Sequence, residues 1–552
     1  MVGSLIAAHG VSHLTSVHTS ETRPAYPQSR MPPTRRTFLQ QAAALGLTCT
    51  TLKARALSPM QDMSKMAPPP RPILHSLELP PFVDALPIPQ LTRPNAAGKL
   101  RVTMREVHTK VHRDVPATRL WTYDTPLIEA RSGQSIDIEW VNNLPKKHFL
   151  PIDHSLHGCG RDIPDVRACV HVHGARTLSK DDGQPGDWYP SDHSRVAHYP
   201  LQQDSAGLWF HDHAMGLNRL NVYAGLVGQL LIRDAAEDAL HLPSGPYEIP
   251  LTLYDRDFTD DGQLYYPDSG DPEHPWVSEF VADAILINGK IRPYLEVEPR
   301  VYRFRVLNAA NSRFFSLSLT GHAPFLQIGS DQGLLPAPLI QTTTLLAPAE
   351  RADILIDFSH LAGQRIHMVN APWDILEFRV TKPLSKAPVT SIPATLRPVP
   401  RTPESAAIKT RTITLNEYKD KVGNSMLMLL NNKRWHEPVT EQPKLNTTEI
   451  WEFVNLTEDV HPMHLHLVRF QILDRRVFDT FAWDMKKEKV FRGPVILPEP
   501  HELGWKDTVQ CPSGMITRII ARFDGYPGKY LYHCHILEHE ANDMMRPFEV
   551  LA

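Results

Sequence analysis

The feature that most constrains this chain is a short stretch near its C-terminus that carries two interleaved sets of metal-binding side chains. Cys534, His539 and Met544 follow one another at a C-x4-H-x4-M spacing. Blue-copper sites hold their metal with two histidines and one cysteine in a plane and a weak axial methionine. The spacing therefore predicts a blue-copper site, for which a second histidine must come from elsewhere in the chain.

Two further histidines, His533 and His535, lie directly on either side of Cys534. The tyrosines and leucine at 530–532 predict a β-strand, in which successive side chains point to opposite faces. His533 and His535 would then share one face, and Cys534 would point to the other. A metal bound by Cys534 would thus be connected by a few covalent bonds to whatever the two histidines bind.

The composition is that of a globular, soluble and nearly neutral protein, with 42% hydrophobic residues and a net charge of -3 in 552 residues. That length suffices for roughly three or four domains. The charge offers no basic face for nucleic acid. The 50 prolines indicate many loops and turns rather than long helices. No apolar run approaches the ~20 residues of a membrane-spanning helix, so we expect no membrane span.

Five cysteines are present. Cys534 is the candidate ligand, and Cys49 lies in a segment that we expect to be removed. Cys159 and Cys169 could pair in an oxidising compartment or remain free thiols, and Cys511 would be left over.

The N-terminal region resembles a twin-arginine export signal. Arg35 and Arg36 are followed by a small-residue apolar run at 42–51 and an A-x-A site at 54–56. We therefore interpret 1–56 as the signal region, with Met31 as an alternative start, and 57–80 as an extended Pro-rich leader. A disordered basic tail is the alternative. The signal predicts a periplasmic or secreted protein.

From about residue 81 the sequence alternates in short strands broken by Pro and Gly, and one pattern recurs three times. The segments 136–142, 302–308 and 449–455 each alternate and end in Asn. Three such units predict an all-β fold of three β-sandwich domains. We place them at 81–240, 241–384 and 408–552, with a Pro-rich linker at 385–407.

The histidine pairs fall only in the first and third units. They are His171 and His173, His211 and His213, His464 and His466, and His533 and His535. Aligning the units puts Asp212 in the place of Cys534 and Leu217 in the place of His539. Only the third unit can therefore form a blue-copper site, with His461 as its second imidazole.

Four H-x-H pairs supply eight imidazoles, too many for one metal. Because two pairs come from each unit, the simplest arrangement is a multinuclear cluster at the interface of the first and third domains, with the second domain as a spacer. Many imidazoles with one thiolate suit copper, whereas structural zinc sites use more cysteines.

These motifs resemble those of the multicopper oxidases, in which H-x-H-G, H-x-H, H-P-x-H-x-H and H-C-H-x3-H-x4-M all occur. Within that family the chain most resembles the bacterial spore-coat laccases, which include bilirubin oxidases, through segments at 82–89, 148–154, 430–436 and 504–507. The resemblance runs from about residue 81 to the end. It implies three cupredoxin-like Greek-key β-sandwiches and four copper ions.

The resemblance also implies a role for each candidate ligand. The blue-copper centre would consist of His461, Cys534, His539 and Met544. His171 and His464 would hold a mononuclear copper. The coupled copper pair would be held by His173, His211, His213, His466, His533 and His535. Electrons would enter through an exposed edge of His539 and pass through Cys534 to the cluster, where dioxygen becomes two waters.

Two acidic residues match positions that the family uses near its oxygen channel. Glu540 adjoins His539, and Asp182 follows His173 by nine residues. Both are candidates for proton transfer. The alternative for Asp182 is a turn residue in the segment 180–183.

The resemblance implies a laccase-type enzyme, a copper-dependent oxidoreductase with O2 as acceptor. Its partners would be O2 and a small phenol, aromatic amine or bilirubin-like tetrapyrrole, and we expect a monomer that binds no nucleic acid. A cuprous-ion oxidase for copper tolerance is the alternative enzyme, but such enzymes often carry a Met-rich insertion, and the segment after Asp479 holds Met485 alone. A copper-free cupredoxin scaffold is the alternative class, and the complete ligand set speaks against it.

Overall fold

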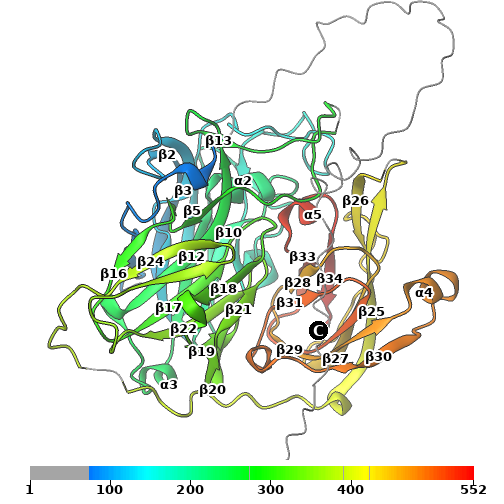
Figure 1. The fold of residues 1–552 in the computed structure, drawn as a ribbon. Helices are drawn as coiled ribbons and strands as arrows, with labels where there is room; N and C mark the ends of the chain where they lie inside the picture. Colours follow the sequence, from blue (N-terminus) through cyan, green and yellow to red (C-terminus); the bar gives the residue numbers. More distant parts are fainter. Residues whose placement is uncertain (1–73, 273, 389–390, 422) are drawn as a thin grey trace, which may run out of the picture. The chain divides into compact units, whose positions relative to one another are not determined.

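The computed structural model describes residues 74–272, 274–388, 391–421 and 423–552. The predicted export signal, Met31, Cys49 and the leader up to residue 73 lie outside these residues. Most of the regular secondary structure in the described part is β-strand (Figure 1). Its α-helices are α2 (Asn218–Ala224), α3 (Ala235–Asp238), α4 (Thr480–Lys486) and α5 (Leu537–Ala541). None of the helices in this part is long and apolar enough to cross a membrane.

The described residues also contain short 3-10 turns. They are η3 (Ser76–Glu78), η4 (Ser179–Asp181), η5 (Gly245–Tyr247), η6 (Thr320–His322), η7 (Glu404–Ala406) and η8 (Pro500–Leu503).

The first sandwich packs a sheet of strand order β1-β4-β11-β10-β7 against a sheet of order β3-β2-β5-β9, and β6 pairs with β8 beside them. Its strands are β1 (Leu91–Thr92), β2 (Lys99–Thr109), β3 (Thr118–Tyr123), β4 (Leu127–Arg131), β5 (Ile136–Asn143), β6 (Arg167–Ala168), β7 (Val170–His173), β8 (Tyr189–Pro190), β9 (His193–Tyr199), β10 (Ala206–Asp212) and β11 (Val227–Arg233). Every second side chain of β5 is buried, from Ile136 to Asn142, as expected for a strand with one face on a core.

The second sandwich contains the sheet β15-β14-β12-β17-β22-β19-β20, with β13 on β12, and the sheet β16-β24-β23-β18-β21. Its strands are β12 (Glu248–Phe258), β13 (Leu264–Tyr265), β14 (Ala284–Ile287), β15 (Lys290–Ile291), β16 (Tyr294–Glu296), β17 (Val301–Asn308), β18 (Phe315–Leu319), β19 (Phe325–Ser330), β20 (Gly333–Gln341), β21 (Thr343–Leu346), β22 (Arg351–Asp357), β23 (Arg365–Asn370) and β24 (Trp373–Arg379).

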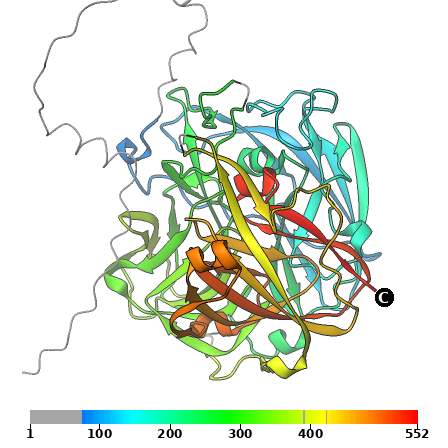
Figure 2. The same ribbon diagram turned by 90° about the vertical axis from the view of Figure 1, so that its right-hand side faces the viewer.

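The third sandwich contains the sheets β26-β25-β27-β32-β29-β30 and β31-β28-β33-β34. Its strands are β25 (Ala407–Lys419), β26 (Ser425–Leu430), β27 (Thr447–Asn455), β28 (His461–Leu465), β29 (Phe470–Phe478), β30 (Phe491–Ile496), β31 (Thr508–Cys511), β32 (Met515–Phe523), β33 (Gly528–Cys534) and β34 (Met545–Val550). The yellow hairpin of β25 and β26 runs beside the red C-terminal strands (Figure 2). The strand predicted at 530–532 is part of β33.

The threefold repeat predicted from the sequence is confirmed. Strands β5, β17 and β27 occupy the same place in their sandwiches, each between a parallel and an antiparallel neighbour. Asn142, Asn308 and Asn455 are fully buried near the ends of these strands, and each side-chain oxygen accepts a hydrogen bond from the backbone N–H two residues further on. An Asn side chain can replace a backbone partner in this way, so the same residue ends the strand three times. The exact domain limits stay predictions.

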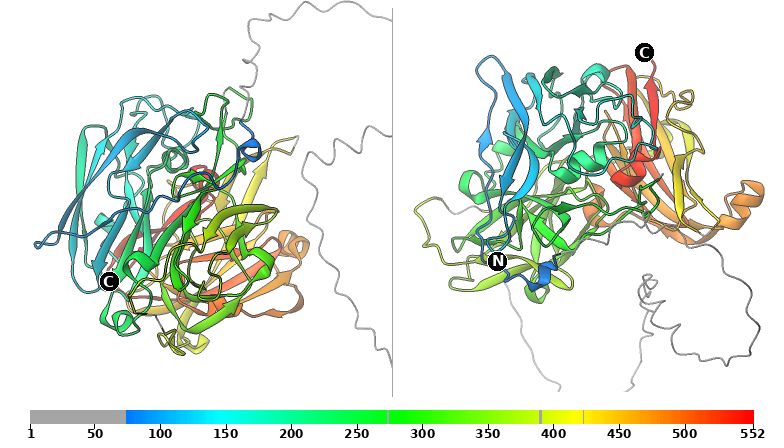
Figure 3. Two further views of the ribbon diagram at one scale, coloured as in Figure 1. Left: turned by 60° about the vertical axis from the view of Figure 1, so that its left-hand side comes forward. Right: turned by 90° about the horizontal axis from the view of Figure 1, so that it is seen from above.

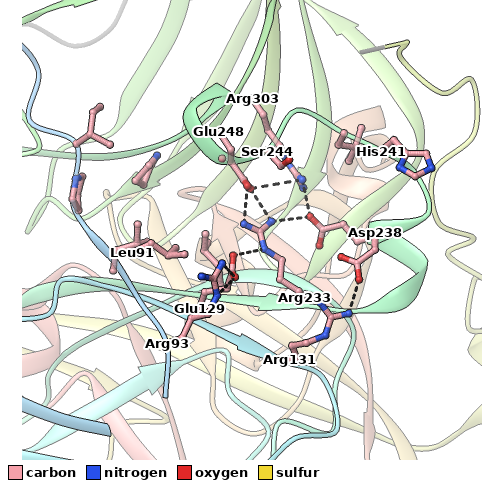
Figure 4. Close-up of a pocket in the computed structure, with 18 residues that line it drawn as sticks. Leu91, Arg93, Glu129, Arg131, Arg233, Asp238, His241, Ser244, Glu248 and Arg303 are labelled. Carbon is pink, nitrogen blue, oxygen red and sulfur yellow. Dashed lines mark hydrogen bonds and ion pairs between the residues drawn. The ribbon is translucent and has the colours of Figure 1, made fainter. Parts of the chain in front are cut away.

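A buried network of arginine and glutamate side chains joins the first sandwich to the second around a cavity of about 530 Å³ (Figure 4). Arg233, at the end of β11, lies 2.7 Å from Glu248 of β12, and Arg303 of β17 lies 2.6 Å from Glu237 of α3. Burial alone would raise the pKa of Glu248, but the surrounding arginines lower it to about 2. Removing one partner of a buried ion pair costs about 3–5 kcal/mol, so the network holds the first sandwich against the second.

We predict that Asn308→Ala lowers the free energy of unfolding of the copper-free protein by about 2–4 kcal/mol. The substitution leaves three buried backbone groups without their partner, namely the carbonyls of Arg313 and Leu346 and the N–H of Ala310. Denaturant unfolding followed by circular dichroism measures the change. Gln442→Ala is the control, because this exposed side chain makes one surface hydrogen bond, to Glu549. Equal stability of the two variants would contradict the role of the strand-end Asn.

Candidate metal centres

Three side chains of the third sandwich converge on one buried point. Cys534 Sγ lies 3.4 Å from Nδ1 of His461 and 3.7 Å from Nδ1 of His539, and the two Nδ1 atoms are 3.2 Å apart. His461 begins β28, Cys534 ends β33, and His539 lies in α5. All three are enclosed by protein. Their atoms are close enough to share a single ion.

The strand-end Asn of the third repeat orients one of these ligands. The Thr457 hydroxyl donates to Oδ1 of Asn455 and therefore accepts a hydrogen bond, of 2.6 Å, from Nε2 of His461. The proton of the neutral imidazole is thereby placed on Nε2, which leaves the lone pair of Nδ1 facing Cys534. A metal ligand oriented through its second nitrogen is typical of metal sites.

The two adjacent methionines have different surroundings. Met544 packs in the same core cluster as Cys534, and its carbonyl accepts a hydrogen bond from the backbone N–H of Cys534. Met545 packs in a separate cluster with Met215 and Leu531. The turn after α5 therefore brings Met544, and not Met545, to the side of Cys534.

Eight imidazoles from four strand ends meet between the first and third sandwiches. They are His171, His173, His211, His213, His464, His466, His533 and His535, all buried. In one group, Nε2 of His533 lies 3.1 Å from Nε2 of His466 and 3.5 Å from Nε2 of His213. His533 points into this group while Cys534 points to His461, which confirms the opposite faces predicted for the strand.

The remaining five histidines direct nitrogen atoms without hydrogen-bond partners into the same region. In the described part of the chain these atoms are Nε2 of His171, Nδ1 of His173, Nε2 of His211, Nε2 of His464 and both nitrogens of His535. Their rings lie close together, with centroids 5.1 Å apart for His173 and His535 and 5.9 Å apart for His171 and His464. Buried polar atoms normally have partners, so this concentration of unpartnered nitrogens fits metal ligation.

Burial also keeps these imidazoles in the form that binds metal. It lowers the pKa of His171 and of His461 to about 3, and it also holds the pKa of His173, His211 and His213 well below the usual value. A histidine must be neutral to bind a metal. The donor set of imidazoles with a single cysteine suits copper better than structural zinc.

Two aspartates hold the outer nitrogens of the cluster. The Asp182 carbonyl accepts a 2.6 Å hydrogen bond from Nδ1 of His171, and its carboxylate lies 2.8 Å from Nδ1 of His466. The Asp507 carbonyl accepts from Nδ1 of His464, and its carboxylate accepts from Nε2 of His173. Asp182 is therefore more than a turn residue, because it orients His171 of the first sandwich and His466 of the third.

Glu540 borders the cluster on another side. Its Oε1 accepts a 2.6 Å hydrogen bond from Asn218 at the start of α2, and it lies 3.3 Å from Nε2 of His213. Its Oε2 lies 3.1 Å from Nδ1 of His533. The structure thus places both acidic candidates, Glu540 and Asp182, beside the histidine cluster.

Comparison with known proteins assigns the family. Two family models, both described as multicopper oxidase, match residues 164–237 and 400–552. A laccase of Bacillus subtilis is 46% identical over 506 residues, which cover 85% of this chain and 98% of the relative. The chain belongs to the multicopper oxidase family. A laccase of Haloferax volcanii is 36% identical over 567 residues, covering 94% of this chain and 90% of the relative.

The solved structures agree with this assignment. The multicopper oxidase McoA of the hyperthermophile Aquifex aeolicus matches with a TM-score of 0.71 and 29% identity, covering 85% of this chain and 99% of the other. The predicted all-β fold of three cupredoxin-like sandwiches is confirmed. This multicopper oxidase is a copper oxidoreductase of laccase type with O2 as acceptor.

Three sequence expectations about this multicopper oxidase need correction or completion. His539 has no exposed edge, since it is 0% exposed and α5 is covered by neighbouring segments. Cys159 and Cys169 are both free and buried, so the disulfide alternative is not realised. Asp212, which stands in the place of Cys534, has a structural role, because its carboxylate accepts hydrogen bonds from the N–H groups of Cys169 and Ala214.

The second sandwich is more than the predicted spacer. Arg351 of β22 donates two hydrogen bonds to the Asp507 carboxylate, and Gln332 donates a third. Burial alone would raise the pKa of Asp507, but Arg351 holds it well below its usual value. A Cβ at Gly174, the glycine of the first H-x-H-G motif, would come within 2.6 Å of Gln332 and Asp507, so glycine is required there.

Sequence reasoning missed Asp507, Arg351 and Gln332 as parts of the site. Asp507 lies in the segment 504–507 that carries the subgroup resemblance, which was the available signal. Arg351 and Gln332 belong to a sandwich without paired histidines, and no local pattern marks them.

We predict that the copper-free protein loses stability as the pH falls from about 6.5 toward 3. The pKa of His171 and His461 is about 3 when folded and about 6.5 when unfolded. The unfolded chain therefore binds more protons in this range, so acid favours unfolding by up to about 1.4 kcal/mol per pH unit for each such histidine. Urea unfolding at a series of pH values measures the slope. His461→Leu should reduce the slope, and stability that rises on acidification would contradict the prediction.

Proposed function

We propose that this multicopper oxidase binds four copper ions and, as a monomer, oxidises small phenols, aromatic amines or bilirubin-like tetrapyrroles. One observation carries the proposal: a Cys534 site and an eight-histidine cluster, both buried, meet at the end of the same strand. When bound, copper would take electrons singly from the organic donor and deliver four of them to dioxygen, which becomes two waters.

The blue-copper ion would be held by His461, Cys534 and His539, with Met544 as the weak axial ligand. The distances among the first three support this assignment, and the packing of Met544 beside Cys534 supports the fourth. An axial thioether tunes the reduction potential and does not carry the electron.

The other three ions would form a trinuclear cluster. His171 and His464 would hold the mononuclear copper, as the family resemblance implies, and the unpartnered Nε2 atom of each is compatible with this role. The coupled pair would be held by His173, His211, His213, His466, His533 and His535. Cys534 links the two sites, since its neighbours His533 and His535 belong to the cluster.

Glu540 and Asp182 would pass protons to dioxygen. Each carboxylate lies against histidines of the cluster and contacts a residue of another sandwich. Glu540 of the third sandwich accepts a hydrogen bond from Asn218 of the first, and Asp182 of the first lies beside His466 of the third. Carboxylates placed at a reduction site can hold a proton and release it as charge develops.

An organic donor is favoured over cuprous ion. The segment after Asp479 forms α4, in which Met485 is the single methionine and is 68% exposed. One exposed thioether does not make a site for a soft cuprous ion, which prefers several sulfur ligands. The copper-free scaffold is disfavoured by the complete set of ligands.

We further propose export by the twin-arginine route to the periplasm or the exterior. Arg35, Arg36, the apolar run at 42–51 and the A-x-A site at 54–56 support this location. A route that carries folded proteins suits an enzyme whose metal ligands come from two ends of the chain.

We predict that Cys534→Ser removes the intense blue absorption and the oxidation of organic donors while keeping about three coppers per chain. A serine hydroxyl cannot replace the thiolate, whereas the cluster histidines are unchanged. Elemental analysis and visible spectroscopy test both statements. The matched control is Cys511→Ser, a second buried cysteine of the same sandwich, which should stay blue. A blue Cys534→Ser protein, or one copper per wild-type chain, would refute the assignment.

The double substitution Arg35→Lys and Arg36→Lys should keep the protein in the cytoplasm, because twin-arginine signals are read by a receptor. Cell fractionation with immunoblotting measures its location. Arg23→Lys with Arg30→Lys, upstream of the motif, is the control and should be exported normally. Normal export of the first variant would argue for another route.

A further inference from the structure

A buried carboxylate lies next to the proposed blue-copper ligand His539 and has no role in the assignments above. Glu538 is 0% exposed. Its Oε1 accepts hydrogen bonds from the Tyr266 hydroxyl, at 2.8 Å, and from the Asn311 amide, at 2.7 Å. Its Oε2 accepts a third, at 2.8 Å, from the Ser312 hydroxyl. All three donors come from the second sandwich and its loops.

The backbone of α5 is held by the same group of residues. The indole N–H of Trp276 donates to the Glu538 carbonyl at 3.0 Å, and the N–H of Leu537 donates to the Asn311 carbonyl at 3.1 Å. Tyr266 and Trp276 belong to the connection between β13 and β14, and Asn311 follows β17. Two separate segments of the second sandwich are therefore hydrogen-bonded to one helix of the third.

Asn311 is the point where all three sandwiches meet. Its amide nitrogen donates to the Arg219 carbonyl in α2 of the first sandwich, at 3.0 Å, as well as to Glu538. Helix α2 itself packs against α5, and the teal α2 and red α5 lie side by side in Figure 3. The guanidinium of Arg219 lies over the ring of Tyr266, which closes the arrangement around Glu538.

Helix α5 depends on such contacts for its position. It has five residues and no side-chain hydrogen bond at its N-cap. A helix of this length has no stability of its own in water, so the neighbouring segments decide where it lies. It carries His539 and Glu540, one residue for each proposed copper centre.

We propose that Glu538 is a positioning residue that fixes α5 to the second sandwich and thereby keeps His539 enclosed. The proposal rests on the copper-ligand role proposed for His539. Through this contact, the sandwich that holds no paired histidines sets the solvent access of the blue-copper site. Solvent access and local polarity determine the reduction potential of a metal site. Exclusion of water disfavours the more highly charged, oxidised ion, so the latch formed by Glu538, Tyr266, Asn311 and Ser312 keeps that potential high.

The test compares Glu538→Ala with Glu538→Gln. A glutamine keeps the shape and can keep all three hydrogen bonds, because its oxygen accepts from Tyr266 and Asn311 while its amide donates to the Ser312 hydroxyl. Alanine removes all three. We expect the alanine variant to show a lower potential at the blue site in a redox titration, and the glutamine variant to stay close to the unaltered protein.

Amide hydrogen exchange of the copper-free proteins gives a second measurement that does not depend on copper. The N–H groups of Glu540, Asn542 and Met544 bond within α5 and its following turn. Their exchange should accelerate roughly tenfold in Glu538→Ala and little in Glu538→Gln, since local opening follows the loss of the contacts that hold a segment. If Glu538→Ala does not fold, Tyr266→Phe combined with Ser312→Ala removes two of the three donors and should shift both readouts in the same direction.

Glu441→Ala is the matched control. Glu441 is also a buried carboxylate of the third sandwich with three side-chain donors, Tyr532, Asn431 and Thr440, but it lies outside α5. Its loss should leave the exchange of α5 and the blue-site potential unchanged. Equal potentials and equal α5 exchange in Glu538→Ala and Glu538→Gln would overturn the latch. A wild-type protein without blue absorption would overturn the copper assignment alone, and the exchange data would still decide the latch.

Discussion

The constraint on which this structure depends is a set of buried imidazole nitrogens that the protein itself leaves without partners. His171 and His464, for example, each have Nδ1 hydrogen-bonded to a backbone carbonyl and Nε2 buried without a partner. An unpartnered buried polar group costs about 1–3 kcal/mol. The first and third sandwiches therefore meet at a surface that is unfavourable without metal. Bound metal would therefore stabilise the contact between these two domains.

The threefold repeat explains how one strand pattern serves both stability and chemistry. The strand-end Asn closes a turn in every sandwich, and in the third the same Asn455 accepts the Thr457 hydroxyl that orients His461. The second sandwich keeps the turn, through Asn308, and uses the residues after it to reach α5. The turn closed by the strand-end Asn is thus the same in all three sandwiches, whereas the side chains beside it differ in function from one sandwich to the next.

Much of this could be predicted from the sequence because the deciding patterns are local. The alternation in 136–142 predicted β5, and the spacing from Cys534 to Met544 predicted residues that the turn after α5 does bring together. What could not be predicted depends on contacts between distant segments. Arg351 reaches Asp507 across 156 positions, and Glu538 reaches Tyr266 across 272. The burial of His539 has the same origin, because neighbouring sandwiches and not its own sequence cover it.

The enclosure of His539 also bears on how an electron reaches the cluster. Under the proposed assignment, an organic donor would not touch the His539 imidazole in this arrangement, so the electron would cross at least one layer of protein. Tyr266 and Trp276 contribute to this layer, since they are hydrogen-bonded to the carboxylate and the backbone carbonyl of Glu538 in α5. Under the proposed ligand assignment, the path beyond that layer would follow the covalent bonds from Cys534 to His533 and His535. Selectivity for the donor would then reside in the second sandwich and its loops, and the reduction of dioxygen in the contact between the first and the third.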